Sequence, residues 1–132
     1  WIMLNVKTSM FNNERCYVYN KALSNFTKNP DTQQEDMFDN IRQWAKDRGL
    51  YDKGNSHTQY VKLQEEAGEL AKALLKNDKP EVIDAIGDMV VVLTNLAHLE
   101  GYTIEQCIAT AYKVISKRKG KMINGTFVKD EN

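Results

Sequence analysis

The chain has 132 residues, 18 of them basic and 18 acidic, so its formal net charge at neutral pH is zero. That length suits one domain with a substantial core, and the charge balance argues against binding nucleic acid through overall charge. No run of 18 apolar residues, no secretory signal and no CxxC occurs, and the two cysteines are Cys16 and Cys107; we therefore expect a cytoplasmic protein whose partners include neither a membrane nor nucleic acid.

Residues 1–33 show no sustained periodicity, and we interpret them as an N-terminal extension of unknown role before a helical domain at 34–132. The first amphipathic helix is predicted at 34–48, with Gly49 ending it. Trp44 lies on its apolar stripe. Two interpretations stay open: a core residue, or a flat platform on which a nucleobase stacks.

A second helix is predicted at 57–77, after a turn-rich connector, and it carries Glu65, Glu66 and Glu69. These acids fit an ordinary solvated face with lysine partners, but Glu66 and Glu69 also share one face of the helix. Lys62 lies one turn before Glu66. It is equally suited to pairing with that carboxylate and to contacting a phosphate.

A third helix is predicted at 80–100, with Asp78 as N-cap and Pro80 in the first turn. It is apolar on nearly every side, yet it carries Asp84 and Asp88, four residues apart. The short break makes the second and third helices antiparallel neighbours, with axes about 8–10 Å apart. Clustered carboxylates need a compensating cation, and hard oxygen ligands suit Mg²⁺ or Mn²⁺. The pattern therefore predicts a metal site at Glu66, Glu69, Asp84 and Asp88.

The segments EEAGELAKAL and DAIGDMVVVLTNLA resemble the MazG-like, all-α nucleotide pyrophosphohydrolases, and RKGKMINGTFVKDEN is similar to the tail of their phage-type members. In that family an ExxE on one helix and an ExxD on the next hold Mg²⁺. The resemblance implies that Glu66 and Glu69 form the ExxE and that Asp88 is the closing Asp.

The chain departs from the family pattern at Ala85, where the family usually has the Glu of its ExxD. Asp84 is adjacent and is expected to substitute, since it shares a face with Asp88. Glu81 with Asp84 also fits ExxD literally, but without the Gly-Asp that accompanies the family's closing acid.

Further along, Asn95 lies two turns beyond Asp88 and is predicted either to bind the substrate or to satisfy a neighbouring carbonyl. A fourth helix is predicted at 103–118, with a capping box from Thr103 to Gln106. We expect it to bury the apolar side chains Ile104, Cys107, Ile108, Ala111, Val114 and Ile115. Its basic end either complements the helix dipole or clamps phosphates; the residues are Lys113, Lys117, Arg118 and Lys121. Asn124-Gly125 predicts a hairpin-like turn after it.

Together these features predict an all-α, four-helix-bundle-like MazG-type fold. The apolar third helix indicates a homodimer or homotetramer, as the family resemblance also implies. The expected chemistry is Mg²⁺-dependent hydrolysis of a nucleoside triphosphate to monophosphate and pyrophosphate, a nucleotide housecleaning reaction, with Glu65 or Glu66 accepting the proton of the attacking water. Two alternatives stay open: a non-catalytic helical oligomerisation module, and a related enzyme acting on dUTP or phosphoribosyl-ATP.

Overall fold

The structure is a computed structural model, and it describes residues 30–131, with side chains from residue 37 onward. Residues 1–29 of the expected extension lie outside the described part. The elements run α2 (Pro30–Asp47), α3 (Leu50–Lys53), α4 (Ser56–Leu75), α5 (Lys79–Leu99), α6 (Ile104–Ile115), β1 (Gly120–Ile123) and β2 (Thr126–Lys129). The all-α prediction with a small C-terminal hairpin is confirmed.

Helix boundaries follow local signals. Asn55 forms a capping box with Thr58 at the start of α4, the Asp78 side chain accepts from the backbone N–H of Glu81, and Thr103 forms a capping box with Gln106. These caps satisfy N–H groups that have no partner within the helix. The expected helix ends were accurate to within about one turn. The turn-rich connector, however, contains the short helix α3.

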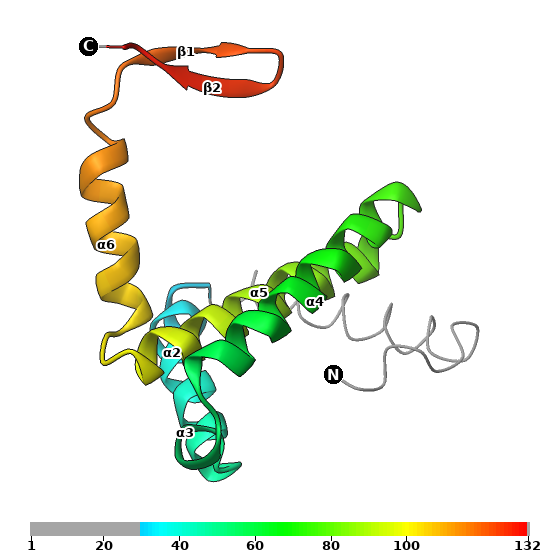
Figure 1. The fold of residues 1–132 in the computed structure, drawn as a ribbon, viewed down its shortest axis with the longest axis vertical. Helices are drawn as coiled ribbons and strands as arrows, with labels where there is room; N and C mark the ends of the chain where they lie inside the picture. The colour runs from blue at the N-terminus through cyan, green and yellow to red at the C-terminus, as the bar shows by residue number, and fades with distance from the viewer. Residues whose placement is uncertain (1–29, 132) are drawn as a thin grey trace.

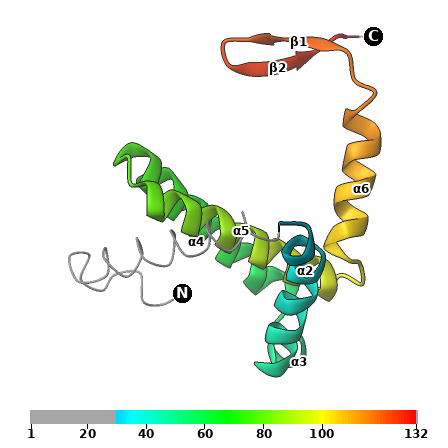
Figure 2. The same ribbon diagram turned by 180° about the vertical axis from the view of Figure 1, so that it is seen from behind.

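Helices α4 and α5 lie antiparallel and side by side along their length, as Figures 1 and 2 show from opposite sides, and they make the most extensive contact in the fold. The break between them turns at Asn77, whose φ of 55° is left-handed, a conformation that Asn tolerates better than most residues. Helix α2 packs across α5. This arrangement brings the two predicted acid helices together.

The core between these helices is unusual because small and polar residues occupy it. Its buried apolar members are mostly alanines, including Ala73 on α4 and Ala85 on α5, while Glu66, Glu81 and Asn95 are buried polar residues. Helix α5 is long and apolar enough to meet the length and composition criterion for a membrane span. One such helix is weak evidence for a membrane span, and α5 carries Glu81, Asp84 and Asp88.

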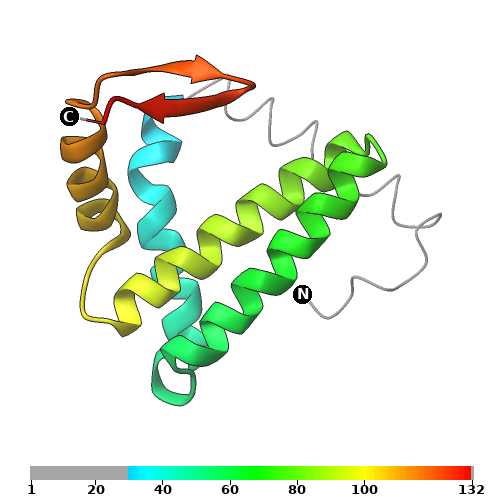
Figure 3. The same ribbon diagram turned by 45° about the horizontal axis from the view of Figure 1, so that its top comes forward.

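Helix α6 leaves the body of the molecule and leads to the β1–β2 hairpin, which lies apart from α4 and α5 in Figures 1 and 3. Of its residues only Ile104 is buried. The prediction that α6 also buries Cys107, Ile108, Ala111, Val114 and Ile115 is wrong for the single chain. The helix is amphipathic as expected, but after the first turn it runs away from the surface that would cover it.

Candidate active site between α4 and α5

Glu66 lies at the centre of the α4–α5 contact. Its residue exposure is only 1 %, and its Oε1 atom has no hydrogen-bond partner. Burial raises the pKa of this carboxyl, and the charges of Asp84, Glu65 and Glu69 act in the same direction, against the opposing effect of Lys62. A buried acid without a partner for one oxygen is costly unless it is protonated or meets a cation.

Asp88 approaches Glu66 from α5 and is half-buried. Its pKa rises to about 6, first because burial disfavours the ionised form, then because of the charges of Asp84 and Glu66, with a smaller contribution from a side-chain hydrogen bond with Glu66. The helix pairing therefore brings carboxyl groups from both helices into one electrostatic environment, as the spacing predicted.

The outer acids of the cluster are less enclosed. Glu69 is half-buried, whereas Asp84 and Glu65 are exposed. Glu65 forms an ion pair with Lys62, with 3.1 Å between Nζ and Oε2, as the interpretation of a solvated face with lysine partners predicted. The charge of Lys62 also acts on Glu66, whose pKa it lowers.

Within residues that the structure describes, no three His, Cys, Asp or Glu side chains already converge as a metal-ligand set. The donors nevertheless fit a hard divalent cation. Glu66 and Asp88 supply carboxylate oxygens from the two helices, and the unpartnered Oε1 of Glu66 is an oxygen donor suited to a cation. Repulsion among acids is a physical reason for their side chains to spread when no cation is present.

A pocket of about 320 Å³ opens beside these acids, between α2 and α5. Trp44 and Asp88 both line it, so the predicted base platform and the predicted metal ligand share one cavity. The remaining lining residues are Met37, Asn40, Ile41 and Val91. Asn40 was not predicted, although its position one turn before Trp44 places it on the same face of α2 and would have been a usable signal.

Asn95 is fully buried, with 0 % exposure. Its Oδ1 accepts a hydrogen bond of 2.7 Å from the hydroxyl of Tyr51, and the Tyr51 ring stacks on His98 with 3.9 Å between centroids. Helix α3 positions Tyr51, which was not predicted as a site residue. Asn95 therefore joins α3 to α5 inside the fold, but its buried Nδ2 has no hydrogen-bond partner. The predicted bond to a neighbouring carbonyl is not seen, and the predicted role in substrate binding stays a prediction.

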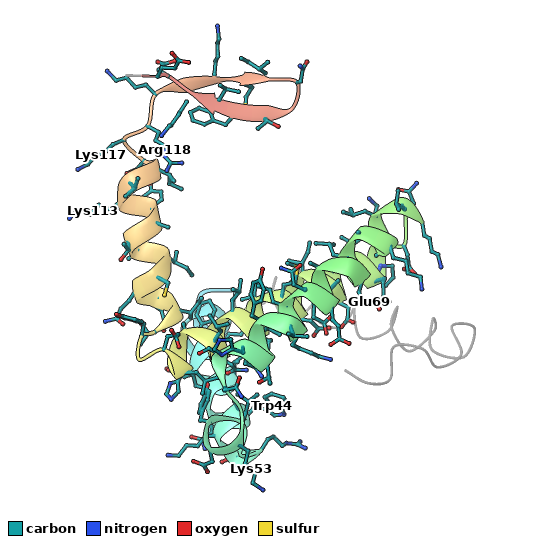
Figure 4. The ribbon with its side chains drawn as sticks, viewed as in Figure 1. Trp44, Lys53, Glu69, Lys113, Lys117 and Arg118 are labelled. Atoms are coloured by element: carbon teal, nitrogen blue, oxygen red, sulfur yellow. The ribbon has the colours of Figure 1, made fainter. Side chains whose placement is uncertain are left out.

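The basic residues expected to clamp phosphates lie elsewhere. Figure 4 shows Lys113 on the last turn of α6 and Lys117 and Arg118 just beyond its end, well away from Glu69 on α4. Lys121 lies beyond them on β1. The single chain does not bring this basic group to the carboxylates. Helix α6 follows the C-terminal end of α5, whereas Asp84 and Asp88 lie in the N-terminal half of α5.

Comparison with known proteins agrees with this geometry. The sequence profile of the phosphoribosyl-ATP pyrophosphohydrolase family matches residues 33–113, more than half of the chain. The chain belongs to this family. The match covers α4 and α5 with all their acids and the part of α2 that carries Trp44, and it confirms the resemblance to the MazG-like all-α enzymes.

A curated relative in Haemophilus phage HP1, described as an uncharacterized 18.2 kDa protein in the rep-hol intergenic region, is 48 % identical over 64 residues. That alignment covers 48 % of this chain and 39 % of the relative, so the chain spans well under half of the relative's length. No solved structure matches the chain significantly. The phosphoribosyl-ATP pyrophosphohydrolase family thus points to pyrophosphohydrolase chemistry on a nucleotide substrate.

Proposed function

We propose that the chain hydrolyses a nucleoside triphosphate, as ribo- or deoxyribonucleotide, to the monophosphate and pyrophosphate, with Mg²⁺ or Mn²⁺ as cofactor. The observation that carries the proposal is the shared pocket of Trp44 and Asp88. An indole suits a nucleobase, and the adjacent carboxyl groups suit the cation that accompanies a triphosphate.

Glu66, Glu69 and Asp88 are the proposed holders of the cation, with Asp84 contributing from the exposed edge. When bound, Mg²⁺ supplies positive charge that neutralises the phosphates and lowers the pKa of a coordinated water. Trp44 fixes the base, and thereby holds the phosphates at the α4–α5 contact. Positioning of this kind is a major part of the catalysis of phosphoryl transfer.

The proton of the attacking water needs an acceptor, and Glu66 and Glu65 are the candidates. Glu66 has the raised pKa and an unpartnered oxygen, which suits a general base. Glu65 is exposed and paired with Lys62, so it becomes available only when Lys62 moves to a phosphate oxygen. Glu65→Gln separates them, since Glu65 is not a proposed holder of the cation. A loss of turnover at saturating substrate and Mg²⁺ identifies Glu65 as the acceptor, and unchanged turnover leaves Glu66.

Phosphoribosyl-ATP is the second candidate substrate, because the matching family is described by that activity. The same diphosphate bond would be hydrolysed, so the carboxyl groups keep their roles. Only the pocket and its surroundings need to accommodate an additional ribosyl phosphate.

The test is a substrate panel containing the common ribo- and deoxyribonucleoside triphosphates, dUTP and phosphoribosyl-ATP, each with Mg²⁺, with Mn²⁺ and with chelator, and with pyrophosphate as the measured product. We expect cation-dependent release with at least one triphosphate. Asp88→Asn is the inactive control. Release from phosphoribosyl-ATP alone selects the second candidate, and no release from any compound by correctly folded protein favours a non-catalytic helical module.

A further inference from the structure

The C-terminal arm, residues 106–129, is the part of the molecule that the proposed function leaves unexplained. It comprises nearly all of α6 and the whole β1–β2 hairpin. In the single chain its large apolar side chains are exposed, among them Ile108 at 52 % together with Tyr112, Val114, Ile115, Met122, Ile123, Phe127 and Val128. An apolar stripe at helical spacing normally faces a partner surface.

The hairpin is well formed, yet uncovered. Asn124 and Gly125 both have left-handed φ, as its tight turn requires, and Phe127 lies over Gly120, where an added Cβ would be 2.7 Å from the ring. From the strand register, Met122 and Phe127 share one face, while Ile123 and Val128 lie on the other. All eight strand residues are exposed. An isolated two-stranded hairpin is only marginally stable in water, so another surface must cover this one.

The chain's own body is poorly placed to do so. The direction of α6 is set at its first turn, where Arg42 on α2 makes a two-pronged pair with Glu105, both distances being 2.8 Å, and where Ile104 is buried. From this anchor α6 leads away from α4 and α5, as all three ribbon views show. Among residues 30–131, which the structure describes, no surface of the same chain therefore covers the arm.

Charge indicates which molecule that is. The arm contains six basic residues, and the two acids that follow it are Asp130 and Glu131, so residues 106–131 are net basic. The body, residues 30–105, contains eight basic and fifteen acidic residues. Two arms repel each other, and an arm is attracted to a body of this chain. A nucleic acid would satisfy the charge, but it offers nothing to the exposed Ile108, Val114 and Ile115.

We propose that the C-terminal arm docks on the body of a second copy of this chain, in a reciprocal exchange that forms a two-fold dimer. The receiving surface is the exposed stripe of α5, namely Ile83, Ile86, Val90 and Leu93, which are spaced along one face and are all more than a third exposed. Each copy then covers the apolar residues of the other's arm, as an isologous interface requires. This inference rests on the fold and the charges, and is independent of the proposed catalytic activity.

The first experiment measures mass in solution by light scattering or sedimentation for the full chain and two variants. Ile108→Asp places a charge on the apolar stripe of α6, and Ala109→Asp makes the same charge change one residue away, where the side chain is also exposed. We expect the unaltered chain and Ala109→Asp to be dimers or multiples of dimers. The Ile108→Asp dimer should dissociate into monomers at a protein concentration at least tenfold higher than the unaltered dimer does. A monomeric unaltered chain, or equal behaviour of both variants, overturns the proposal.

The second experiment identifies what touches the arm. In a Cys16→Ser background, the native Cys107 on α6 is exposed, and Ile86→Cys adds a thiol on the α5 stripe. Residue 86 is thirteen residues before the end of α5, roughly 20 Å along the axis, so a short bis-maleimide does not join the two thiols within one chain. We expect covalent dimers, confirmed by mass spectrometry as linkages between residues 107 and 86; Ile83→Cys serves as a second position.

Two control proteins assign the contact. In the Cys16→Ser background, Ile86→Cys with Cys107→Ser forms covalent dimers only if the α5 stripes of two copies meet. The Cys16→Ser background alone forms them only if the arms of two copies meet. Either result without the linkage between residues 107 and 86 overturns the arm exchange, as does the absence of any linkage. If the protein binds added double-stranded DNA through the arm and no linkage forms between residues 107 and 86, the arm is instead a nucleic-acid contact.

Discussion

Glu66 on α4 and Asp88 on α5 meet across the helix contact as two acids that share an enclosed environment, and the pKa of both is raised. Twenty-one residues separate them along the chain, and the antiparallel pairing brings them together. The direction of the shift means that the folded protein holds protons here that the unfolded chain releases.

The stability of the metal-free protein should therefore decrease as pH rises. Asp88 ionises with a pKa of about 6 in the folded state, against 3.8 as the ordinary value, so its stabilising protonation is complete below about pH 4 and lost as pH passes through 6. We expect the melting temperature in chelator to fall between pH 5 and pH 7.5. Asp88→Asn should flatten this slope, whereas Asp52→Asn on α3 should leave it unchanged.

A divalent cation should reverse that loss. Asp88 is ionised at pH 7.5, since this pH lies above its pKa of about 6, and a cation that binds only the folded state raises stability by mass action. We expect millimolar Mg²⁺ or Mn²⁺ to raise the melting temperature of the unaltered chain and to have little effect on Glu66→Gln or Asp88→Asn. Calorimetry that detects no divalent binding, with or without nucleotide, would remove the metal site.

Neutralising the acids should separate catalysis from folding. Glu69→Gln and Asp88→Asn keep the side-chain shape and relieve repulsion, so turnover should collapse while the melting temperature in chelator is kept or raised. A purely structural cluster gives the opposite result, because stranding one partner of a buried ion pair costs about 3–5 kcal/mol. Measuring both quantities on the same samples distinguishes the two.

Trp44 should report base binding directly. Base stacking on an aromatic ring contributes about 1–3 kcal/mol, so Trp44→Ala should raise the KM for nucleotide roughly tenfold or more, with a smaller effect on kcat, and Trp44→Phe should recover most of the loss. Nucleotide should also quench indole fluorescence in a Trp1→Phe background. An unchanged KM in correctly folded Trp44→Ala places the base elsewhere.

Asp84 and Ala85 test how the departure from the family pattern is accommodated. Asp84 is exposed at the edge of the cluster, whereas Ala85 is buried, with 1 % exposure. We expect Asp84→Asn to weaken the apparent affinity for Mg²⁺ more than it lowers the saturated rate, as for a ligand that acts through a retained water.

Adding Ala85→Glu to that variant should recover metal affinity by restoring the family's acid. Because position 85 lies in the enclosed α4–α5 contact, the same change should destabilise the metal-free protein. Titrations followed by activity and by melting temperature measure the two effects separately. If Asp84→Asn is silent at limiting Mg²⁺, Asp84 is not a ligand.

Local features of this protein could be read from the sequence because short-range physics decides them. The caps at Asp78 and Thr103, the turn at Asn124-Gly125 and the sharing of a face by Glu66 and Glu69 depend on neighbours within about one turn. The short break before α5 also determined that the acid helices would pair, since so few residues permit little else. These signals were enough to predict the all-α fold and the location of the acid cluster.

Only the tertiary structure decided which side chains meet across longer distances. The pocket shared by Trp44 and Asp88 depends on how α2 crosses α5, and the burial of Asn95 depends on Tyr51 from α3, neither of which is encoded in a local pattern. The start of α6 is joined to α2 by the pairing of Arg42 with Glu105, 63 residues apart. Helical periodicity identified the apolar stripe of α6 correctly, but a stripe specifies only that a partner surface is needed; the packing of the whole chain determines whether that surface lies in the same molecule.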